Sequence, residues 1–230
     1  KLSLKKNPTT YLPFNKMKVR LKKEIVSLGF PNLNVIKSNS EYIHPKDWDK
    51  FTNQKKIKLI DTRNVYEIPI GKFENAINPL TSSFREFPKK FHDLKIDKNQ
   101  EIALYCTGGI RCEKASTYLK IKGFRKVYQL KGGILNYLDY YKKRSKINKW
   151  RGECFVFDKR VSVNKNLEEG SFLQCYGCRR PLSQEDLKSK YYLRGVYCPY
   201  CCEERTDDQK KRSKDRQEQI DLFKYSYCNK

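Results

Sequence analysis

The chain has little of several residue types, and each shortage excludes something. It contains one methionine, two histidines and only 26 acidic residues against 50 basic ones. No stretch approaches the roughly 18 consecutive apolar residues of a membrane-spanning helix, and no signal peptide opens the chain. No Gly-x-Gly-x-x-Gly motif is present, so no NAD or flavin motif is recognised. The two histidines, His44 and His92, form no recognisable two-histidine, one-carboxylate iron site.

What the chain does contain predicts a folded protein with a polyanionic partner. Its 230 residues are 38% hydrophobic and include 16 tyrosines and 12 phenylalanines, enough for one full domain and a small second one. The net charge of +24 is uneven, because residues 1–40 contribute +8 and residues 106–150 contribute +10. A general preference for lysine explains an even excess but not this distribution, which indicates binding to a polyanion.

Four segments are predicted along the chain. Residues 1–40 are interpreted as the remnant of an N-terminal domain with a basic linker, and residues 41–150 as a catalytic domain. Residues 151–202 are Cys-rich, and residues 203–230 form a charged helix or tail. The sequence begins with Lys1 and its only methionine is Met17, so we expect the natural N-terminal part to be missing.

Strand and helix patterns alternate in the catalytic segment. The apolar runs 57–60, 102–105 and 127–130 have the length of buried strands, and helical patterns follow near Ile110 and Ile134. Such alternation predicts an α/β fold with a parallel sheet flanked by helices. Its functional loops then lie at the carboxyl ends of the strands.

One of these loops has the composition of a reactive thiol site. It consists of Cys106, Thr107, Gly108, Gly109, Ile110 and Arg111. Glycines allow successive backbone N–H groups to point at one anion, and the N-terminus of the following helix and Arg111 add positive potential. These features lower the pKa of a thiol, so Cys106 is predicted to be the nucleophile and Arg111 its fixed cation. The alternative is a buried structural cysteine.

A second cysteine group has metal-ligand spacing. Two Cys-x-x-Cys pairs are separated by 19 residues and consist of Cys175, Cys178, Cys198 and Cys201. This spacing predicts a four-cysteine zinc ribbon with structural zinc, with metal-free cysteines or disulfides as the alternative. Cys202 leaves the fourth ligand ambiguous. The odd total of nine cysteines fits a reducing cytoplasm better than a disulfide framework.

Basic and aromatic residues lie between the two cysteine pairs. They are Arg179, Arg180, Tyr191, Tyr192 and Arg194. Tyrosine rings stack on unpaired bases, and arginines contact phosphates. This combination predicts an RNA-binding surface, although each residue taken alone is an ordinary surface residue.

The spacing of the Cys106 loop resembles that of the rhodanese family. Its four residues between Cys106 and Arg111 are one fewer than in cysteine-dependent phosphatases, which disfavours a phosphatase. The segment IDTRNVYEIPIGKFENAIN (60–78) is similar to the first rhodanese signature, with Lys72 in place of a common histidine. By this resemblance, Asp61 and Arg63 support the loop rather than act chemically.

Five blocks together resemble the rhodanese-domain tRNA uridine hydroxylases. They are MKVRLKKEIV (17–26), SFREFP (83–88), YCTGGIRCEKAS (105–116), YQLKGGIL (128–135) and GECFVFDKRV (152–161). The resemblance runs from about Phe14 to about Cys201. It implies a rhodanese-like fold with a C-terminal zinc-ribbon-like domain, and a cytoplasmic enzyme acting on the tRNA anticodon arm. It further implies that wobble uridine becomes 5-hydroxyuridine, with molecular oxygen as co-substrate and Cys106 as the active residue.

Two other functions remain open at this stage. A rhodanese-type sulfurtransferase would form a persulfide on Cys106 and pass the sulfur to a thiol or RNA acceptor. A zinc-dependent RNA-binding module on an inactive scaffold is disfavoured by the intact Cys106 and Arg111. Cys112, six residues after Cys106, is either a resolving thiol or, more simply, packs on the inner face of its helix.

Overall fold

The structure is a computed structural model that describes residues 19–33, 35, 41–144 and 148–228, the last six of these by backbone alone. Residues 1–18 and 36–40, which belong to the predicted N-terminal segment, lie outside this description. Within the described residues, no helix is both long and apolar enough to cross a membrane.

A four-stranded parallel sheet forms the centre of the molecule. Its strands, in spatial order, are β1 (Glu41–Ile43), β5 (Val127–Leu130), β4 (Glu101–Tyr105) and β2 (Ile57–Asp61). The three strands predicted from apolar runs are all present, and β1 is an additional edge strand. The expected α/β class with a parallel sheet is confirmed.

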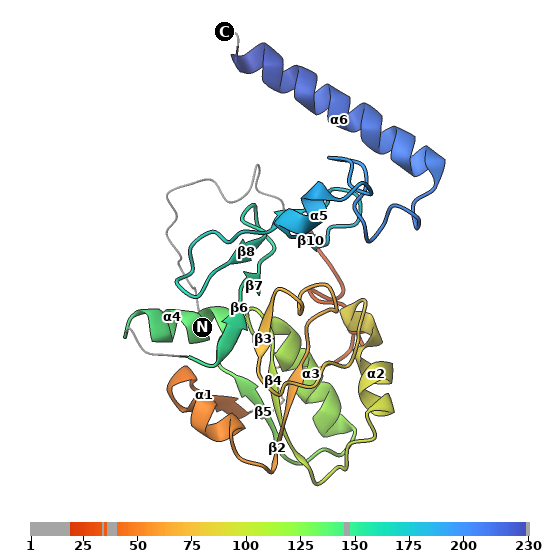
Figure 1. Ribbon diagram of the computed structural model, residues 1–230. Coiled ribbons are helices and arrows are strands. Elements are labelled where there is room, and N and C mark those ends of the chain that lie inside the picture. The colour runs from red at the N-terminus through yellow and green to blue at the C-terminus, as the bar shows by residue number, and fades with distance from the viewer. Residues whose placement is uncertain (1–18, 34, 36–40, 145–147, 229–230) are drawn as a thin grey trace.

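Helices cover both faces of this sheet (Figure 1). Helices α1 (Pro45–Thr52) and α4 (Gly133–Lys142) pack on one face, whereas α2 (Phe87–Asp93) and α3 (Ile110–Ile121) pack on the other. A short 3₁₀ helix, η1 (Phe84–Glu86), leads into α2. The layers therefore follow from the alternation of strand and helix, because each crossover places a helix on one face.

Alternate residues of the central strands supply two separate cores. Ile102 and Leu104 of β4 pack with α2 and α3, whereas Ala103 and Tyr105 pack with α1 and α4. Successive side chains of a strand point to opposite faces, so a strand covered on both sides is apolar throughout. This explains why β4 reads as a continuous apolar run rather than an alternating one.

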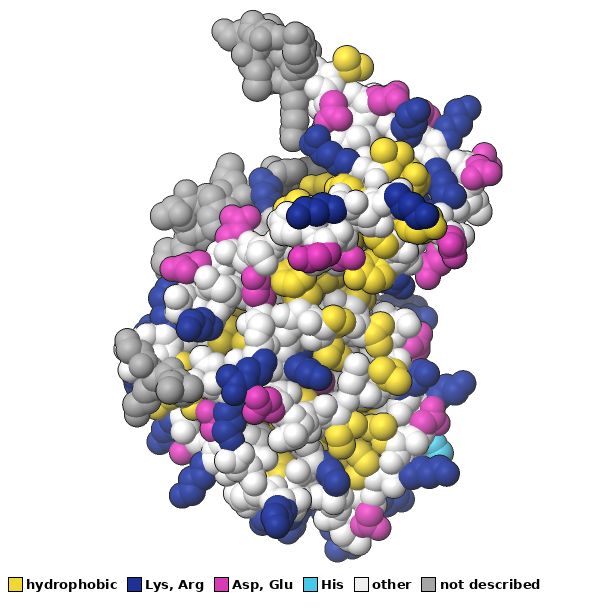
Figure 2. Space-filling model, in the orientation of Figure 1, with side chains coloured by type: hydrophobic (Ala, Val, Ile, Leu, Met, Phe, Trp, Pro, Cys, Tyr) yellow, Lys and Arg dark blue, Asp and Glu magenta, His cyan; other side chains and the backbone are white. Residues whose placement is uncertain are grey.

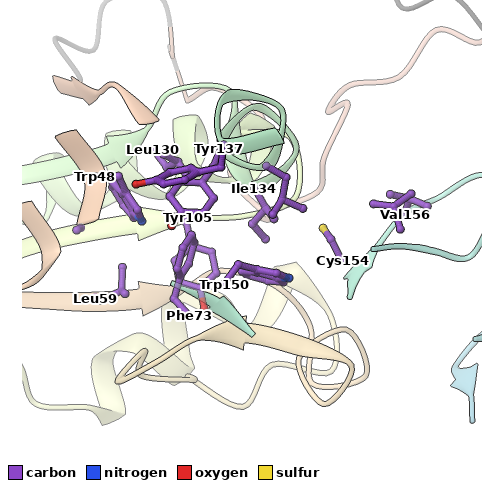
Figure 3. Packing of buried hydrophobic residues seen from close by; sticks show 14 of the residues in the cluster. Trp48, Leu59, Phe73, Tyr105, Leu130, Ile134, Tyr137, Trp150, Cys154 and Val156 are labelled. Carbon is purple, nitrogen blue, oxygen red and sulfur yellow. The ribbon is translucent and has the colours of Figure 1, made fainter. Parts of the chain in front are cut away.

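The core between the sheet and helices α1 and α4 extends beyond the predicted domain boundary at residue 150. Strand β3 (Gly71–Phe73) pairs antiparallel with β6 (Trp150–Gly152), and β7 (Cys154–Phe155) pairs with β8 (Ser162–Val163). Figure 3 shows Trp150 between the rings of Phe73 and Tyr105 on one side and Cys154 on the other, and all four residues belong to this core. Residues 150–163 thus pack as part of the sheet domain, where they can contribute to its functional end.

The Cys-rich region is a small separate layer. It holds the antiparallel pair β9 (Leu173–Gln174) and β10 (Pro181–Leu182), followed by α5 (Gln184–Lys188). Ser183 begins α5 with a capping box, in which its side chain accepts the N–H of Asp186. Helix α6 (Asp207–Cys228) follows and extends away from the sheet domain (Figure 1).

Candidate functional site

The Cys106 loop lies between the carboxyl end of β4 and the N-terminus of α3, as the sequence predicts. The N-terminus of α4 fixes its backbone, since the N–H groups of Ile134 and Leu135 donate to the carbonyls of Cys106 and Thr107 at 2.9 and 3.1 Å. Gly133 has φ +67°, and a Cβ there would lie 2.5 Å from the Cys106 carbonyl oxygen. Gly133 is therefore required for the close approach of α4 to the reactive loop.

This approach predicts different outcomes for two glycine variants. We expect Gly133→Ala to lower the free energy of unfolding by about 2 kcal/mol, because the new methyl group overlaps loop backbone and alanine disfavours a positive φ. Gly108→Ala is the matched control, since a Cβ at Gly108 meets nothing within 4 Å. Urea denaturation of both variants checks this, and equal stabilities would contradict it.

The surroundings of Cys106 favour its thiolate. Cys106 is 2% exposed, and burial alone raises the pKa of the thiol. Hydrogen bonds from the Cys112 side chain, the positive charge of Arg111 and the N–H groups of Cys112 and Gly109 outweigh that effect and lower the pKa to about 6. The Gly109 N–H lies 3.1 Å from Sγ. At neutral pH, Cys106 is therefore mostly the nucleophilic thiolate.

The Cys112 thiol is packed in the same core as Cys106 and lowers the pKa of the Cys106 thiol. It is fully buried on α3, its own pKa is raised by burial, and the Thr62 hydroxyl lies 3.5 Å from its sulfur. The inner-face packing considered for this residue is therefore correct, and its thiol also polarises the reactive sulfur. Cys112 is a positioning residue for the Cys106 thiolate.

A pH profile tests this arrangement. The specificity constant kcat/KM for a reaction of the Cys106 thiolate should fall as pH drops through about 6, where the thiol becomes protonated, and should be flat above neutral pH. Cys112→Ala removes a donor to the thiolate, so the midpoint should move to higher pH. Cys112→Ser keeps a donor and should leave the midpoint near that of the wild type. Identical midpoints for the alanine and serine variants would contradict the role of Cys112.

Arg111 is held by a carboxylate that the sequence reading did not single out. Glu67 is fully buried, and its Oε2 accepts a hydrogen bond of 2.8 Å from Nη2 of Arg111. The pKa of Arg111 is lowered by burial but raised more strongly by Glu67, and the net shift is upward. Arg111 is thus a fixed cation beside Cys106, as predicted, but Glu67 balances its charge. Glu67 lies within the 60–78 block, so the motif contained it without indicating its partner.

Asp61 and Arg63 organise the segment that carries Glu67. Arg63 forms a buried ion pair with Asp61 at 2.7 Å, and it donates to the backbone carbonyls of Glu67 and Gly71 at 3.2 and 2.7 Å. Its guanidinium also lies 5.0 Å from the ring centroid of Trp150. Neither side chain lines the Cys106 cavity. This geometry agrees with the supporting role that the resemblance implies for both residues.

Cys106 opens into a cavity of about 540 Å³. Ile25, Phe84, Leu135 and Phe157 are among its apolar walls, which come from segments far apart in the chain. The full set of lining residues is Ile25, Val26, Asn64, Phe84, Cys106, Thr107, Gly108, Ile110, Arg111, Leu135, Val156, Phe157, Asp158 and Arg160. The predicted loop residues thus line the cavity, except Gly109, whose N–H instead points at Sγ.

The four predicted metal ligands come together in the Cys-rich region. Cys175, Cys178, Cys198 and Cys201 place their sulfur atoms within 4.8 Å of one another. Three of the separations are 3.9 Å (Cys175–Cys201), 3.7 Å (Cys178–Cys198) and 3.7 Å (Cys198–Cys201). A tetrahedral ion with metal–sulfur bonds of about 2.3 Å separates its ligand atoms by about 3.8 Å. The cluster therefore fits a metal ion such as zinc.

The structure places Cys202 outside this cluster. Its thiol points to the Pro199 carbonyl oxygen at 3.6 Å. Cys201 instead lies with the other three sulfurs, and four thiolates leave no position open for a substrate. The ambiguity between the two adjacent cysteines is thus resolved in favour of Cys201, and a metal here has a structural role.

Three of the five basic and aromatic residues predicted to bind RNA line one cavity. Arg179, Tyr192 and Arg194 line a second cavity beside the Cys-rich region. Arg180 instead donates to the Tyr200 carbonyl oxygen at 2.9 Å, and Tyr191 is contacted by the Lys190 ammonium. Spacing in the sequence indicated the region but not which side chains converge.

Comparison with known proteins assigns the sheet domain. Residues 44–139 match the family model described as the rhodanese-like domain. This match covers α1 through most of α4 and includes the Cys106 loop, so the chain contains a rhodanese-like domain. The rhodanese-like fold expected for the segment 41–150 is thereby confirmed.

Several solved structures are similar over part of the chain. A rhodanese-related protein from Thermoplasma volcanium is 21% identical over 44% of this chain and 92% of its own, with a TM-score of 0.35. A polysulfide-sulfur transferase from Wolinella succinogenes is 21% identical, with coverages of 48% and 82% and a TM-score of 0.38. A single-domain sulfurtransferase from Saccharomyces cerevisiae is 19% identical, with coverages of 45% and 93% and a TM-score of 0.38.

Proposed function

We propose that this protein is a rhodanese-type sulfurtransferase that carries sulfur as a persulfide on Cys106 and passes it to a thiol acceptor. The observation that carries the proposal is the Cys106 thiol itself. It lies in a rhodanese-like domain at the N-terminus of α3, with its pKa lowered to about 6. A thiolate that is abundant at neutral pH and faces a cavity is the group that attacks sulfane sulfur.

The two half-reactions balance without a further oxidant. The Cys106 thiolate attacks the sulfane sulfur of a donor such as thiosulfate, the donor S–S bond breaks, and sulfite leaves with the electron pair. The outer sulfur of the resulting persulfide is then attacked by an acceptor thiolate. The bond to Cys106 Sγ breaks and the thiolate is restored. The Gly109 N–H and the Arg111 guanidinium stabilise the sulfur anion that departs or forms in each step.

A thiosulfate-to-cyanide assay tests this proposal. The wild-type protein should form thiocyanate catalytically, with kinetics in which sulfite leaves before cyanide reacts. Replacement of cyanide by a low-molecular-weight thiol should also give turnover. Absence of turnover with thiosulfate and polysulfide donors alike would overturn the sulfurtransferase assignment.

A second candidate function is hydroxylation of the wobble uridine of tRNA to 5-hydroxyuridine, with molecular oxygen as co-substrate. One observation favours it. Each of the five blocks that resemble the tRNA uridine hydroxylases contributes to the cavity at Cys106. Examples, in the order of the blocks, are Val26, Phe84, Cys106, Leu135 and Phe157. Two of these blocks lie outside the rhodanese-like match, so a sulfur carrier alone leaves their place in the cavity unexplained.

Nucleoside analysis separates the two candidates. Digested tRNA from cells lacking this protein would be compared after complementation with the wild-type gene or with Cys106→Ala. Restoration of 5-hydroxyuridine by the wild type alone would establish hydroxylation and place Cys106 in that reaction. Thiocyanate formation without this nucleoside would leave sulfur transfer as the function. The second candidate function also includes the tRNA anticodon arm as the binding partner and the cytoplasm as the compartment.

A further inference from the structure

A second cavity, of about 660 Å³, adjoins the one at Cys106. Phe157 and Asp158 line both cavities. The other walls of the second cavity come from the turn after β7 and from the Cys-rich region. A chain-like ligand with one unit at Cys106 can therefore place its neighbouring unit in the second cavity.

The chemistry of the second cavity is that of a nucleotide site. Three cations, Lys159, Arg179 and Arg194, line it together with the rings of Tyr176 and Tyr192. Tyr176 is 56% exposed, so much of its side chain is accessible to a ligand. Bases stack on aromatic rings, and phosphates pair with arginine and lysine. The interleaving of rings and cations is the pattern of single-strand binding rather than of a purely apolar docking site.

Acidic groups near the cavity are already paired. Asp158 accepts a hydrogen bond of 2.7 Å from Arg160, and Asp221 lies 3.7 Å from Arg194. The second pair is half-exposed, so Arg194 can exchange Asp221 for a phosphate at little cost. The cavity therefore presents net positive charge to a ligand. Figure 2 shows lysine and arginine side chains around the hydrophobic residues of the Cys-rich region.

Arg179 occupies a backbone conformation that favours glycine. Its φ is +69°, directly after the metal-ligand position Cys178. A non-glycine residue there costs roughly 1 kcal/mol or more. Its guanidinium lies 5.8 Å from the centroid of the Tyr176 ring, on the wall of the cavity. An unfavourable residue that places a cation beside a stacking ring points to a role in binding.

From this placement we propose that the second cavity binds single-stranded RNA, holding a nucleotide next to the one presented to Cys106. This inference rests on the second candidate function, in which RNA is the substrate presented to Cys106, and it names where the neighbouring nucleotide is held. Tyr176 stacks on the base, and Arg179 and Arg194 contact the adjoining phosphates.

Fluorescence anisotropy with a labelled short oligouridylate tests the proposal on the zinc-loaded full chain. Tyr176→Ala should weaken binding about fivefold or more, whereas Tyr176→Phe, which keeps the ring, should bind like the wild type. Arg179→Gly should weaken binding and lower the salt slope by about 0.7, the value for one lost single-strand phosphate contact. Its thermal midpoint should not fall, because glycine tolerates the backbone conformation.

Arg125→Ala is the matched charge control. Arg125 is exposed and directly precedes Lys126 and β5, at the end of the sheet opposite Cys106, and its loss should leave oligouridylate binding within twofold. Wild-type affinity in Tyr176→Ala and Arg179→Gly, or equal displacement of the RNA by a polyglutamate peptide, would overturn the inference.

Sulfur transfer measured on the wild type separates the two proposals. If the wild type transfers sulfur while the cavity variants bind RNA normally, only the RNA site is refuted. If the wild type transfers no sulfur but the variants lose RNA binding, the RNA site stands and the sulfurtransferase assignment fails.

Discussion

Replacing Cys201 by serine is expected to release the metal and unfold the Cys-rich region. Cys201 is one of four converging thiols, and the buried core around them is small, with Leu182 as its buried aliphatic member. Structural zinc supplies on the order of 10 kcal/mol of folding free energy in such small units. Loss of one ligand should therefore abolish stoichiometric zinc and expose residues 173–202 to proteolysis.

Cys202→Ser is the matched control, because it changes the neighbouring thiol that points away from the cluster. Zinc content by atomic emission and limited proteolysis should leave this variant like the wild type. The sheet domain should stay folded in both variants, since its cores contain none of the four ligands. Loss of zinc in Cys202→Ser with retention in Cys201→Ser would contradict the placement of the fourth ligand.

Replacing Cys106 by alanine is expected to abolish sulfur transfer, with a loss of at least about a thousandfold in kcat/KM. No persulfide can form without this sulfur, and removal of a covalent nucleophile typically costs several orders of magnitude. The other groups of the loop cannot substitute, because Arg111 is held by Glu67 and Cys112 is fully buried with a raised pKa. Thiocyanate formation from thiosulfate and cyanide measures the effect.

Cys154→Ala provides the control for removal of a buried thiol. Burial raises the pKa of Cys154 to about 12, and its sulfur points to the Phe155 carbonyl oxygen at 3.6 Å. This thiol is therefore inert at neutral pH, and its variant should retain activity. Substantial activity in Cys106→Ala, or an equal loss in Cys154→Ala, would show that another group carries the sulfur.

The sheet and the reactive loop could be predicted because their signals are local. Strand runs such as 102–105 and 127–130 are apolar throughout, since helices cover both faces of the sheet. The glycines of the Cys106 loop and the two Cys-x-x-Cys pairs likewise form motifs whose residues lie within a few positions of one another. For this reason the loop cysteine proposed as the nucleophile, its neighbouring cation and the four candidate metal ligands could be singled out from local composition and spacing.

The partner of Arg111, the outer wall of the Cys106 cavity and the packing of residues 150–163 depend on contacts between distant segments. Glu67 pairs with Arg111 across 44 residues, and Phe157 reaches the Cys106 cavity from beyond the predicted boundary at residue 150. Strands β3 and β6 are only three residues long and pair antiparallel outside the main sheet. No periodicity identifies such short strands, so the packing of residues 150–163 against the sheet domain could not be predicted from one sequence.

The central claim is that Cys106 carries sulfane sulfur, and intact-mass analysis tests it most directly. Protein incubated with thiosulfate and desalted should gain the mass of one sulfur atom, and peptide mapping should locate it on Cys106. Subsequent addition of cyanide should remove it and yield thiocyanate. The unmodified mass, or a sulfur adduct that maps to Cys112, Cys154 or the Cys-rich region instead, would contradict the account.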